Sequence, residues 1–270
     1  MQEKRDRPIG VFDSGIGGLT VLKEVIRELP QESTIYLGDT ARVPYGIRSA
    51  ETVTRYSFEN TNFLSSRDIK ILVVACNTAS SVALHAVKNR VSIPVIGVIE
   101  PGAKAAVRAT RNKKIGVIGT AATVHSSAYA KAIHAIDSSI QVFGLPCPLF
   151  VPLVEEGWIS GRIAMMIAKH YLAGMQEKGI DTLVLGCTHY PLLKKVISRV
   201  MGKDVTLIDS AVETSREIRT LLEVFDLKRD PTKSPSRHFY VTDSPERFVK
   251  VGEIFLGEKI DHIEQIIVGN

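Results

Sequence analysis

A motif that occurs twice sets the strongest limit on the fold. Each copy is a short apolar run that ends at a cysteine and leads into a helix-like pattern. One copy spans residues 71–80 and carries Cys76, and the other spans residues 182–191 and carries Cys187. The two cysteines are 111 residues apart (187 − 76). A repeat over that distance predicts two structural units of similar length built on one plan.

A second pair of strings supports the repeat. Residues 9–15 read Ile-Gly-Val-Phe-Asp-Ser-Gly and residues 115–121 read Ile-Gly-Val-Ile-Gly-Thr-Ala, at an offset of 106 (115 − 9). The glycine-rich turn at residues 13–18 leads into a helix that we expect to begin near Leu19. Such a turn can hold a phosphate or a carboxylate at the helix N-terminus, or it can be purely structural. The Gly-Lys-Ser/Thr of a P-loop does not follow it, so nucleotide binding is weakly supported.

Short apolar strands alternate with helical segments along the chain, which is typical of parallel sheets covered on both faces. We therefore predict an α/β fold of two pseudo-symmetric, doubly wound parallel-sheet domains that face each other across a central cleft. Strands are expected at 8–12, 34–39, 71–75, 95–99, 115–118, 141–143, 182–186, 205–209 and 238–242. Helices are expected between them, including 81–89, 126–136 and 160–178. By spacing, the core-facing stripe of the last helix is Ile163, Met166, Ile167, Tyr171 and Met175.

The boundary between the two domains is predicted near Pro101-Gly102, because the Ile-Gly-Val pattern restarts at Ile115. Residues 1–99 together with 211–270 form the first predicted domain, and residues 100–210 form the second. In this arrangement the C-terminal tail folds back onto the first domain, and the second domain is an insertion.

Composition narrows the class of protein. Hydrophobic residues make up 44% of the 270 residues, which is enough for proper cores. No apolar run has the ~18 residues of a membrane span, and the charged residues 1–7 lack the apolar region of a secretory signal, so we expect a cytoplasmic protein without membrane attachment. Three cysteines without Cys-x-x-Cys spacing argue against a disulfide scaffold. The net charge of +5 is spread among 29 acidic residues and aromatics make up 6%, so nucleic-acid binding is not expected.

The repeat places Cys76 and Cys187 at the carboxyl ends of matching strands, where open α/β sheets bind ligands. If the domains face each other, both thiols point into one cleft. One thiolate could then remove a proton from a carbon while the other thiol delivers a proton to the opposite face, which inverts that carbon. A single cysteine in such a turn is more often an inert buried residue. The matching positions favour the catalytic interpretation.

Polar residues around these turns are candidate substrate contacts, because removing a proton next to a carboxylate requires donors to the substrate oxygens. The candidates are Ser14, Asn77, Thr78, Thr120, Thr123 and Thr188. His189 can stabilise the neighbouring thiolate as a cation, donate to the substrate, or lie partly exposed at a helix N-terminus. Asp13 can serve the first thiol as His189 serves the second, or it can cap its own helix. One Cys-x-His pair is a weak metal site, so no metal is expected, and Cys147 between two prolines is interpreted as structural.

Strings from both halves resemble those of the glutamate racemases, in the cofactor-independent Asp/Glu racemase family, over nearly the whole chain. The strings are GVFDSGIGG at 10–18, GDT at 38–40, VPYG at 43–46, ACNTA at 75–79, FVPLVE at 150–155 and GCTHYP at 186–191. The resemblance implies an enzyme that interconverts L-glutamate and D-glutamate and needs neither pyridoxal phosphate nor a metal. It also implies that the product supplies peptidoglycan synthesis. A homodimer is a further expectation.

The resemblance assigns roles residue by residue. It implies Cys76 and Cys187 as the acid–base pair, with Cys76 acting on the D-enantiomer and Cys187 on the L-enantiomer. Asp13 and His189 are implied as helpers of the respective thiols. Glu155 is implied as a carboxylate near the histidine, although the next residue is also a glutamate and leaves this assignment open. The implied substrate contacts are Asp13, Ser14, Tyr45, Gly46, Asn77, Thr78, Thr188 and His189.

Other functions stay open at this point. Racemisation of aspartate or of hydantoins is the nearest alternative, because side-chain length separates these substrates and the sequence does not position the loops that would hold the distal carboxylate. A non-catalytic protein that clamps a small anion would share the fold, but it would not need a thiol on each wall. Some relatives carry a longer N-terminal extension linked to activation by a cell-wall nucleotide precursor. About eight residues precede the first strand here, so such activation is not expected.

Overall fold

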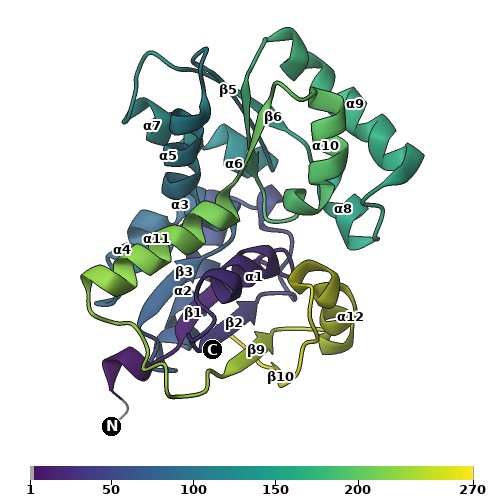
Figure 1. Cartoon of the computed structure of the whole chain (residues 1–270). Coiled ribbons are helices and arrows are strands. Elements are labelled where there is room, and N and C mark those ends of the chain that lie inside the picture. The colour runs from purple at the N-terminus through teal and green to yellow at the C-terminus, as the bar shows by residue number, and fades with distance from the viewer. Residues whose placement is uncertain (1–2, 270) are drawn as a thin grey trace.

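The computed structural model describes residues 3–269 and has two lobes joined at a waist (Figure 1). Each lobe is an α/β domain built on its own parallel sheet. The sheet of the first domain contains β1 (Ile9–Asp13), β2 (Thr34–Gly38), β3 (Ile71–Val74), β4 (Val95–Gly97), β9 (Arg237–Val241) and β10 (Ile263–Gln265). The sheet of the second domain contains β5 (Lys114–Gly119), β6 (Gln141–Pro146), β7 (Thr182–Gly186) and β8 (Thr206–Asp209).

The two sheets repeat one strand order. The first runs β10-β9-β2-β1-β3-β4 and the second runs β6-β5-β7-β8, so β2-β1-β3-β4 corresponds to the whole second sheet. The register corresponds as well, because Ile9 pairs with Ile71 in the first sheet and Ile115 pairs with Thr182 in the second. The two sequence offsets therefore relate equivalent strand pairs, and the predicted pseudo-symmetric fold is confirmed.

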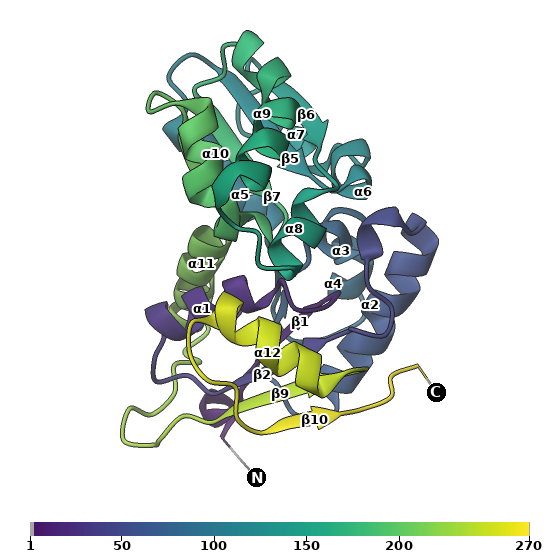
Figure 2. The same cartoon turned by 90° about the vertical axis from the view of Figure 1, so that its right-hand side faces the viewer.

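Helices cover both faces of each sheet (Figures 1 and 2). Central strands such as β1 and β7 are therefore buried along their whole length. Those of the first domain are α1 (Leu19–Glu28), α2 (Ala50–Ser65), α3 (Asn77–Val82), α4 (Leu84–Lys88) and α12 (Pro245–Leu256). Those of the second are α5 (Ile99–Ala109), α6 (Ala121–His125), α7 (Ala128–His134), α8 (Phe150–Glu155), α9 (Gly161–Glu177) and α10 (Lys194–Met201). Short 3₁₀ turns among the described residues are η1 (Lys4–Asp6), η2 (Tyr45–Ile47) and η3 (Tyr190–Leu193). The helix α11 (Ser210–Val224) lies across the waist and packs on both α1 and α5.

Two predicted helices differ from the observed ones. The helix predicted at 81–89 is the pair α3 and α4, and α3 already begins at Asn77 because Cys76 caps it, with Sγ accepting the N–H of Ala79 at 3.5 Å. The helix predicted at 126–136 begins only at Ala128. It cannot start earlier, because Ser127 has a left-handed φ of 57°.

No loop interrupts the chain at Pro101-Gly102, where the domain boundary was predicted, because a helix continues through these residues. Both residues lie in the first turn of α5, where proline is tolerated because the N–H groups there have few helical acceptors. The chain passes from the first sheet to the second after β4 and returns after β8, so that β9 pairs with β2. The division into residues 1–99 plus 211–270 and residues 100–210 stays a prediction.

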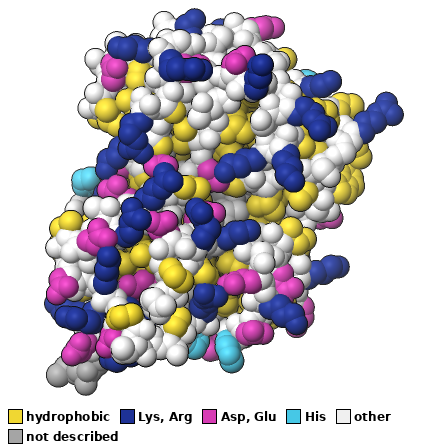
Figure 3. Space-filling model, viewed as in Figure 1, with side chains coloured by type: hydrophobic (Ala, Val, Ile, Leu, Met, Phe, Trp, Pro, Cys, Tyr) yellow, Lys and Arg dark blue, Asp and Glu magenta, His cyan; other side chains and the backbone are white. Residues whose placement is uncertain are grey.

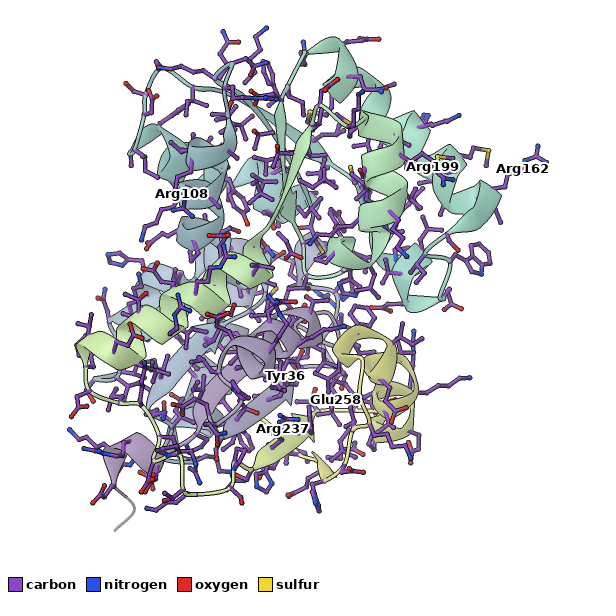
Figure 4. The ribbon with its side chains drawn as sticks, in the orientation of Figure 1. Tyr36, Arg108, Arg162, Arg199, Arg237 and Glu258 are labelled. Atoms are coloured by element: carbon purple, nitrogen blue, oxygen red, sulfur yellow. The ribbon has the colours of Figure 1, made fainter. Side chains whose placement is uncertain are left out.

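The predicted core stripe of α9 is wrong at its first positions. The buried side chains are Ala164, Ala168, Leu172 and Met175, whereas Ile163 and Met166 are 45% and 60% exposed. Hydrophobic side chains lie along the edge of the second domain that α9 forms (Figure 3), and Arg162 projects from the same helix into solvent (Figure 4). The small alanine side chains suit the close packing of α9 on α10. Alanine is only weakly hydrophobic, so the hydrophobic pattern of the sequence does not reveal this buried face.

The surface is charged and mixed in sign. Lys and Arg side chains lie among Asp and Glu on the face in Figure 3. Some pairs join α5 to α11, such as Lys104 with Glu217 at 3.1 Å and Arg108 with Glu213 at 2.8 Å. Within residues 3–269, no helix combines the length and the apolar character that crossing a membrane requires.

Candidate active site

A small cavity lies between the two domains at the carboxyl ends of their central strands. It encloses about 30 Å³, which is room for roughly two water molecules. The predicted residues that line it are Ser14, Tyr45, Gly46, Cys76, Asn77, Thr78, Thr120, Cys187, Thr188 and His189. Asp13, Thr123 and Glu155 lie behind this lining. Val43, Pro44 and Val151 also line the cavity, although the sequence did not mark them as site residues.

Larger hollows lie elsewhere among residues 3–269, and two of them are far larger than the cavity with the thiols. One, of about 630 Å³, is lined by residues 235–239 and by parts of 258–262, and another, of about 570 Å³, includes residues 69–70 and 91–94. Both lie at the amino ends of strands, whereas open α/β sheets bind ligands at the carboxyl ends. Position and side-chain chemistry favour the small cavity with the two thiols.

The Cys76 wall of the cavity is hydrogen-bonded but strongly desolvated. Cys76 is 5% exposed, and its Sγ lies 3.6 Å from the hydroxyl of Ser14. Burial, together with the nearby carboxylate of Asp13, raises the pKa of the Cys76 thiol to about 12, against the opposing effect of the Ala79 N–H and of Ser14. A thiol in this setting keeps its proton at neutral pH.

Asp13 lies at the end of β1 and is fully buried. Its Oδ2 accepts the N–H of Gly15 at 2.9 Å, while its Oδ1 has no hydrogen-bond partner among residues 3–269. Burial raises the pKa of Asp13, and His189 and the backbone N–H groups of the glycine-rich turn oppose that rise. The contact with Gly15 belongs to the turn before α1, whose N-cap is Gly18 and has no side-chain cap, so Asp13 holds this turn and does not cap the helix. Support of the Cys76 thiol stays a prediction.

The Cys187 wall carries a chain of polar groups. Cys187 Sγ lies 3.9 Å from His189 Nδ1, and His189 Nε2 lies 3.0 Å from Glu155 Oε1. Arg247 of α12 approaches Glu155 Oε2 at 3.4 Å. Glu156 is exposed, so the carboxylate at the histidine is that of Glu155.

Electrostatics make the histidine a cation. Burial by itself lowers the pKa of His189, but its hydrogen bonds to Cys187 and Glu155 outweigh burial and raise the pKa to about 10. The bond to His189 likewise lowers the pKa of Glu155, against burial, and Arg247 adds to that effect. At neutral pH an imidazolium therefore lies beside Cys187.

Hydroxyl and amide groups complete the lining. Thr78, Thr120 and Thr123 form a triangle of hydroxyls with Oγ1 separations of 3.0, 3.3 and 3.0 Å, and this triangle joins the two domains. Asn77 accepts a hydrogen bond from the hydroxyl of Tyr129 at 2.7 Å. Its Nδ2 is buried without a partner among residues 3–269, which leaves a donor for a ligand.

The loop with Tyr45 and Gly46 is fixed from behind. The Tyr45 hydroxyl donates to Asp39 and accepts from Asn60 Nδ2 at 3.0 Å. A Cβ on Gly46 would lie 2.7 Å from Cβ of Thr120 on the other domain, so only glycine lets the two walls approach this closely. The string VPYG therefore forms part of the interface as well as of the cavity.

Several residues of this site had no sequence signal. Arg247 and Tyr129 reach the site from helices whose local pattern is ordinary, and only the packing of distant segments brings them there.

Cys147 is fully buried and burial raises its thiol pKa to about 12, in agreement with a structural residue. Among residues 3–269, no three His, Cys, Asp or Glu side chains gather in an arrangement suited to a metal ion.

Known proteins resemble this chain over nearly its full length. Residues 9–218 match the model of a family described as Asp/Glu/Hydantoin racemase. The glutamate racemase of Geobacter metallireducens is 56% identical over 260 residues, which cover 96% of each chain. The glutamate racemase isoform RacE1 of Bacillus anthracis superposes with a TM-score of 0.94 at 44% identity, covering 97% of this chain and 98% of that one. The Francisella tularensis glutamate racemase in complex with D-glutamate gives 0.92 at 43% identity, with the same coverage.

Proposed function

Because the chain belongs to the Asp/Glu/hydantoin racemase family, and is therefore a racemase and an isomerase, we propose that it interconverts L-glutamate and D-glutamate. The similar proteins named above are glutamate racemases, and one of them was solved with D-glutamate. The observation that carries the proposal is that two thiols, one from each domain, line one enclosed cavity. A protein that only clamps an anion has no use for that pair.

In the L-to-D direction the base is Cys187. As a thiolate it removes the Cα proton of L-glutamate, and the imidazolium of His189 beside it stabilises the negative charge on sulfur. Glu155 holds the other nitrogen of the ring, which fixes the direction in which Nδ1 points. His189 and Glu155 thus act as helpers of the Cys187 thiolate.

The acid in that direction is Cys76. Its raised pKa keeps it protonated at neutral pH, so a proton is available on the wall opposite the base. Transfer of this proton to Cα leaves Cys76 as thiolate and Cys187 as thiol, and the D-to-L reaction runs from that state in reverse. Asp13, buried next to this wall, is the helper that we propose for Cys76.

Negative charge develops on the substrate carboxylate when the Cα proton leaves, and donors must meet it. The unpartnered Nδ2 of Asn77 and the hydroxyls of Ser14, Thr78 and Thr188 are the donors we propose. Tyr45 and Gly46, together with Thr120, Thr123 and His189, are proposed as further substrate contacts.

The proposed chemistry is complete with two thiols and hydrogen-bond donors, so we propose a reaction without a cofactor. D-glutamate as product points to a supply role in peptidoglycan synthesis, in the cytoplasm, with glutamate as the small-molecule partner. A homodimer is a further proposal that follows the family resemblance.

Circular dichroism of L-glutamate over time tests the function. The protein is purified, kept reduced, dialysed against chelator and used without added pyridoxal phosphate. We expect it to bring the circular dichroism signal of L-glutamate to zero. L-aspartate measured in parallel should keep its signal. A falling aspartate signal with a constant glutamate signal would move the specificity to the neighbouring substrate, and two constant signals would favour an anion-binding protein.

A further inference from the structure

Two hydrogen bonds cross the domain interface at the residue that follows each cysteine. Tyr129 on α7 of the second domain donates its hydroxyl to Oδ1 of Asn77, the residue after Cys76, at 2.7 Å. Thr20 on α1 of the first domain donates its hydroxyl to the carbonyl of Thr188, the residue after Cys187, at 2.9 Å. Each domain therefore holds the turn that carries the cysteine of the other domain.

The bond from Tyr129 decides which end of the Asn77 amide faces the cavity. An amide has one oxygen that accepts and one nitrogen that donates, and the tyrosine hydroxyl here donates to the oxygen. The nitrogen is buried and has no partner among residues 3–269, and Asn77 lines the cavity, so we infer that this nitrogen is the donor offered to the substrate. Without the tyrosine hydroxyl, the Asn77 amide is free to flip. Its oxygen would then face the substrate carboxylate, and the two oxygens would repel each other.

Tyr129 is itself held firmly. It is 2% exposed, and its ring lies so close to Gly102 and Gly186 that a Cβ on either glycine would approach a ring carbon at 3.2 Å. Gly186 directly precedes Cys187, so one side chain contacts the turns of both cysteines. Burial raises the pKa of Tyr129, so its hydroxyl keeps the proton that it donates.

Thr20 lies in an equally close contact. Its hydroxyl proton is shared between the Thr188 carbonyl and the carbonyl of Gly17, 3.0 Å away. A Cβ on Gly17 would lie 2.3 Å from Thr188 Oγ1 and 2.5 Å from His189 Nδ1. The start of α1 is thus packed directly against the turn that carries Cys187 and His189.

We propose that Tyr129 and Thr20 are reciprocal positioning residues, which fix the two cysteine-bearing turns relative to each other by crossed hydrogen bonds between the domains. This inference rests on the proposed function for its kinetic consequences. Tyr129 acts on the substrate through Asn77, and Thr20 acts on the base through the backbone of Thr188.

The substitution Tyr129→Phe removes only the hydroxyl. Because the Asn77 amide contacts the substrate before and during proton transfer, we expect KM for both enantiomers to rise about tenfold, with a smaller change in kcat. In Thr20→Val the thiol turn loses its support, so kcat should fall about tenfold with a smaller change in KM. Since L- and D-glutamate have equal free energies, kcat/KM must stay equal in the two directions for every variant, which checks the measurements.

Matched controls remove comparable buried hydroxyls whose bonds stay inside one domain. Tyr190 donates to the carbonyl of Cys147 at 2.8 Å within the second domain, and Thr61 donates to the carbonyl of Ser57 at 2.6 Å within α2. Tyr190→Phe and Thr61→Val should lower Tm as the test variants do, yet keep KM and kcat. Kinetic changes in Tyr129→Phe and Thr20→Val no larger than in these controls would overturn the inference.

A second measurement does not depend on turnover. If the wild-type protein leaves glutamate unchanged, the proposed function fails, and the rate at which iodoacetamide alkylates each thiol then decides the inference. Mass spectrometry of the peptides should show Cys76 reacting about fivefold faster in Tyr129→Phe, and Cys187 about fivefold faster in Thr20→Val, because each turn has lost one buried hydrogen bond. Rates equal to those of the control variants would overturn it.

Discussion

The two cysteines occupy equivalent positions in the repeat, yet their neighbours differ. Cys76 lies beside a neutral hydroxyl and a buried carboxylate, whereas Cys187 lies beside an imidazolium. The Cys76 wall therefore favours a thiol, and the other wall places a cation beside Cys187. In the proposed mechanism this difference makes Cys187 the base for the L-enantiomer, although the fold that carries the two thiols is symmetric.

Replacement of either thiol should stop racemisation but leave half of the chemistry. With Cys76→Ala the base Cys187 is intact, so in D₂O we expect exchange of the Cα proton of L-glutamate and none of D-glutamate. Cys187→Ala should show the opposite preference. Racemisation should fall at least about a thousandfold in both variants, since one proton-transfer group is lost. Full turnover in either variant, measured by circular dichroism, would contradict the two-base mechanism.

The glycine at position 17 should be essential for activity. A Cβ there would collide with Thr188 and His189, and a shift of the catalytic groups by about 1 Å can cost about a hundredfold in rate, so we expect kcat of Gly17→Ala to fall by that order. Gly174→Ala is the matched control, because a Cβ at Gly174 meets open space on α9. It should keep kcat and gain up to about 1 kcal/mol in stability.

The ion pair of His189 and Glu155 should make stability depend on pH. The folded pKa of His189 is about 10 against an ordinary 6.5, so its contribution is complete below pH 6.5 and is lost as pH rises toward 10. The pKa of Glu155 is lowered from 4.5, so its contribution is lost as pH falls below that value. Glu155→Gln should cost about 3 kcal/mol between these limits.

Urea unfolding at several pH values measures this difference. Glu156→Gln, a change of the exposed neighbour, should reproduce the wild-type profile. If Glu155→Gln loses the same free energy at pH 10 as at pH 5.5, the charged histidine does not contribute as described.

At the scale of single elements, α9 shows where sequence patterns mislead. Its hydrophobic residues at 163 and 166 face solvent, and its buried face contains two alanines with Leu172. We expect Leu172→Ala to cost about 3 kcal/mol in urea unfolding, because it leaves a cavity, and Met166→Ala to cost less than about 0.5 kcal/mol. Equal losses would mean that α9 is turned differently about its axis.

The strands and their cysteine turns could be predicted, because a buried parallel strand needs a continuous apolar run and the repeat supplies each run twice. The start of α3 at Asn77 was missed, since a cysteine is not an ordinary helix cap and its sulfur accepts the Ala79 N–H only in the folded turn. Arg247 and Tyr129 were missed because no local pattern reports contacts between segments far apart in the chain. The sequence limited the carboxylate partner of His189 to two adjacent glutamates. Only the way α8 is placed in the fold shows that Glu155 is the one that bonds to the histidine.

At the scale of the whole molecule, the cavity is too small for its proposed substrate. About 30 Å³ holds roughly two waters, and glutamate is several times larger. We therefore expect the domains to separate when glutamate enters. In X-ray scattering we expect a larger radius of gyration for the free protein than with saturating glutamate, and identical profiles would count against such closure.

The two connections between the sheets lead directly into α5 and α11, which pack on each other on one side of the waist. The contact between α8 and α12, made by Glu155 and Arg247, lies on the other side (Figure 1). We expect this pair of crossings to act as a hinge, because rotation about it would move nearby atoms little and distant atoms most. The widest opening should then lie beside Arg247, so that a cation lies where a dicarboxylate enters. Tyr129 contacts α5 and α11, so it should stay close to the hinge axis.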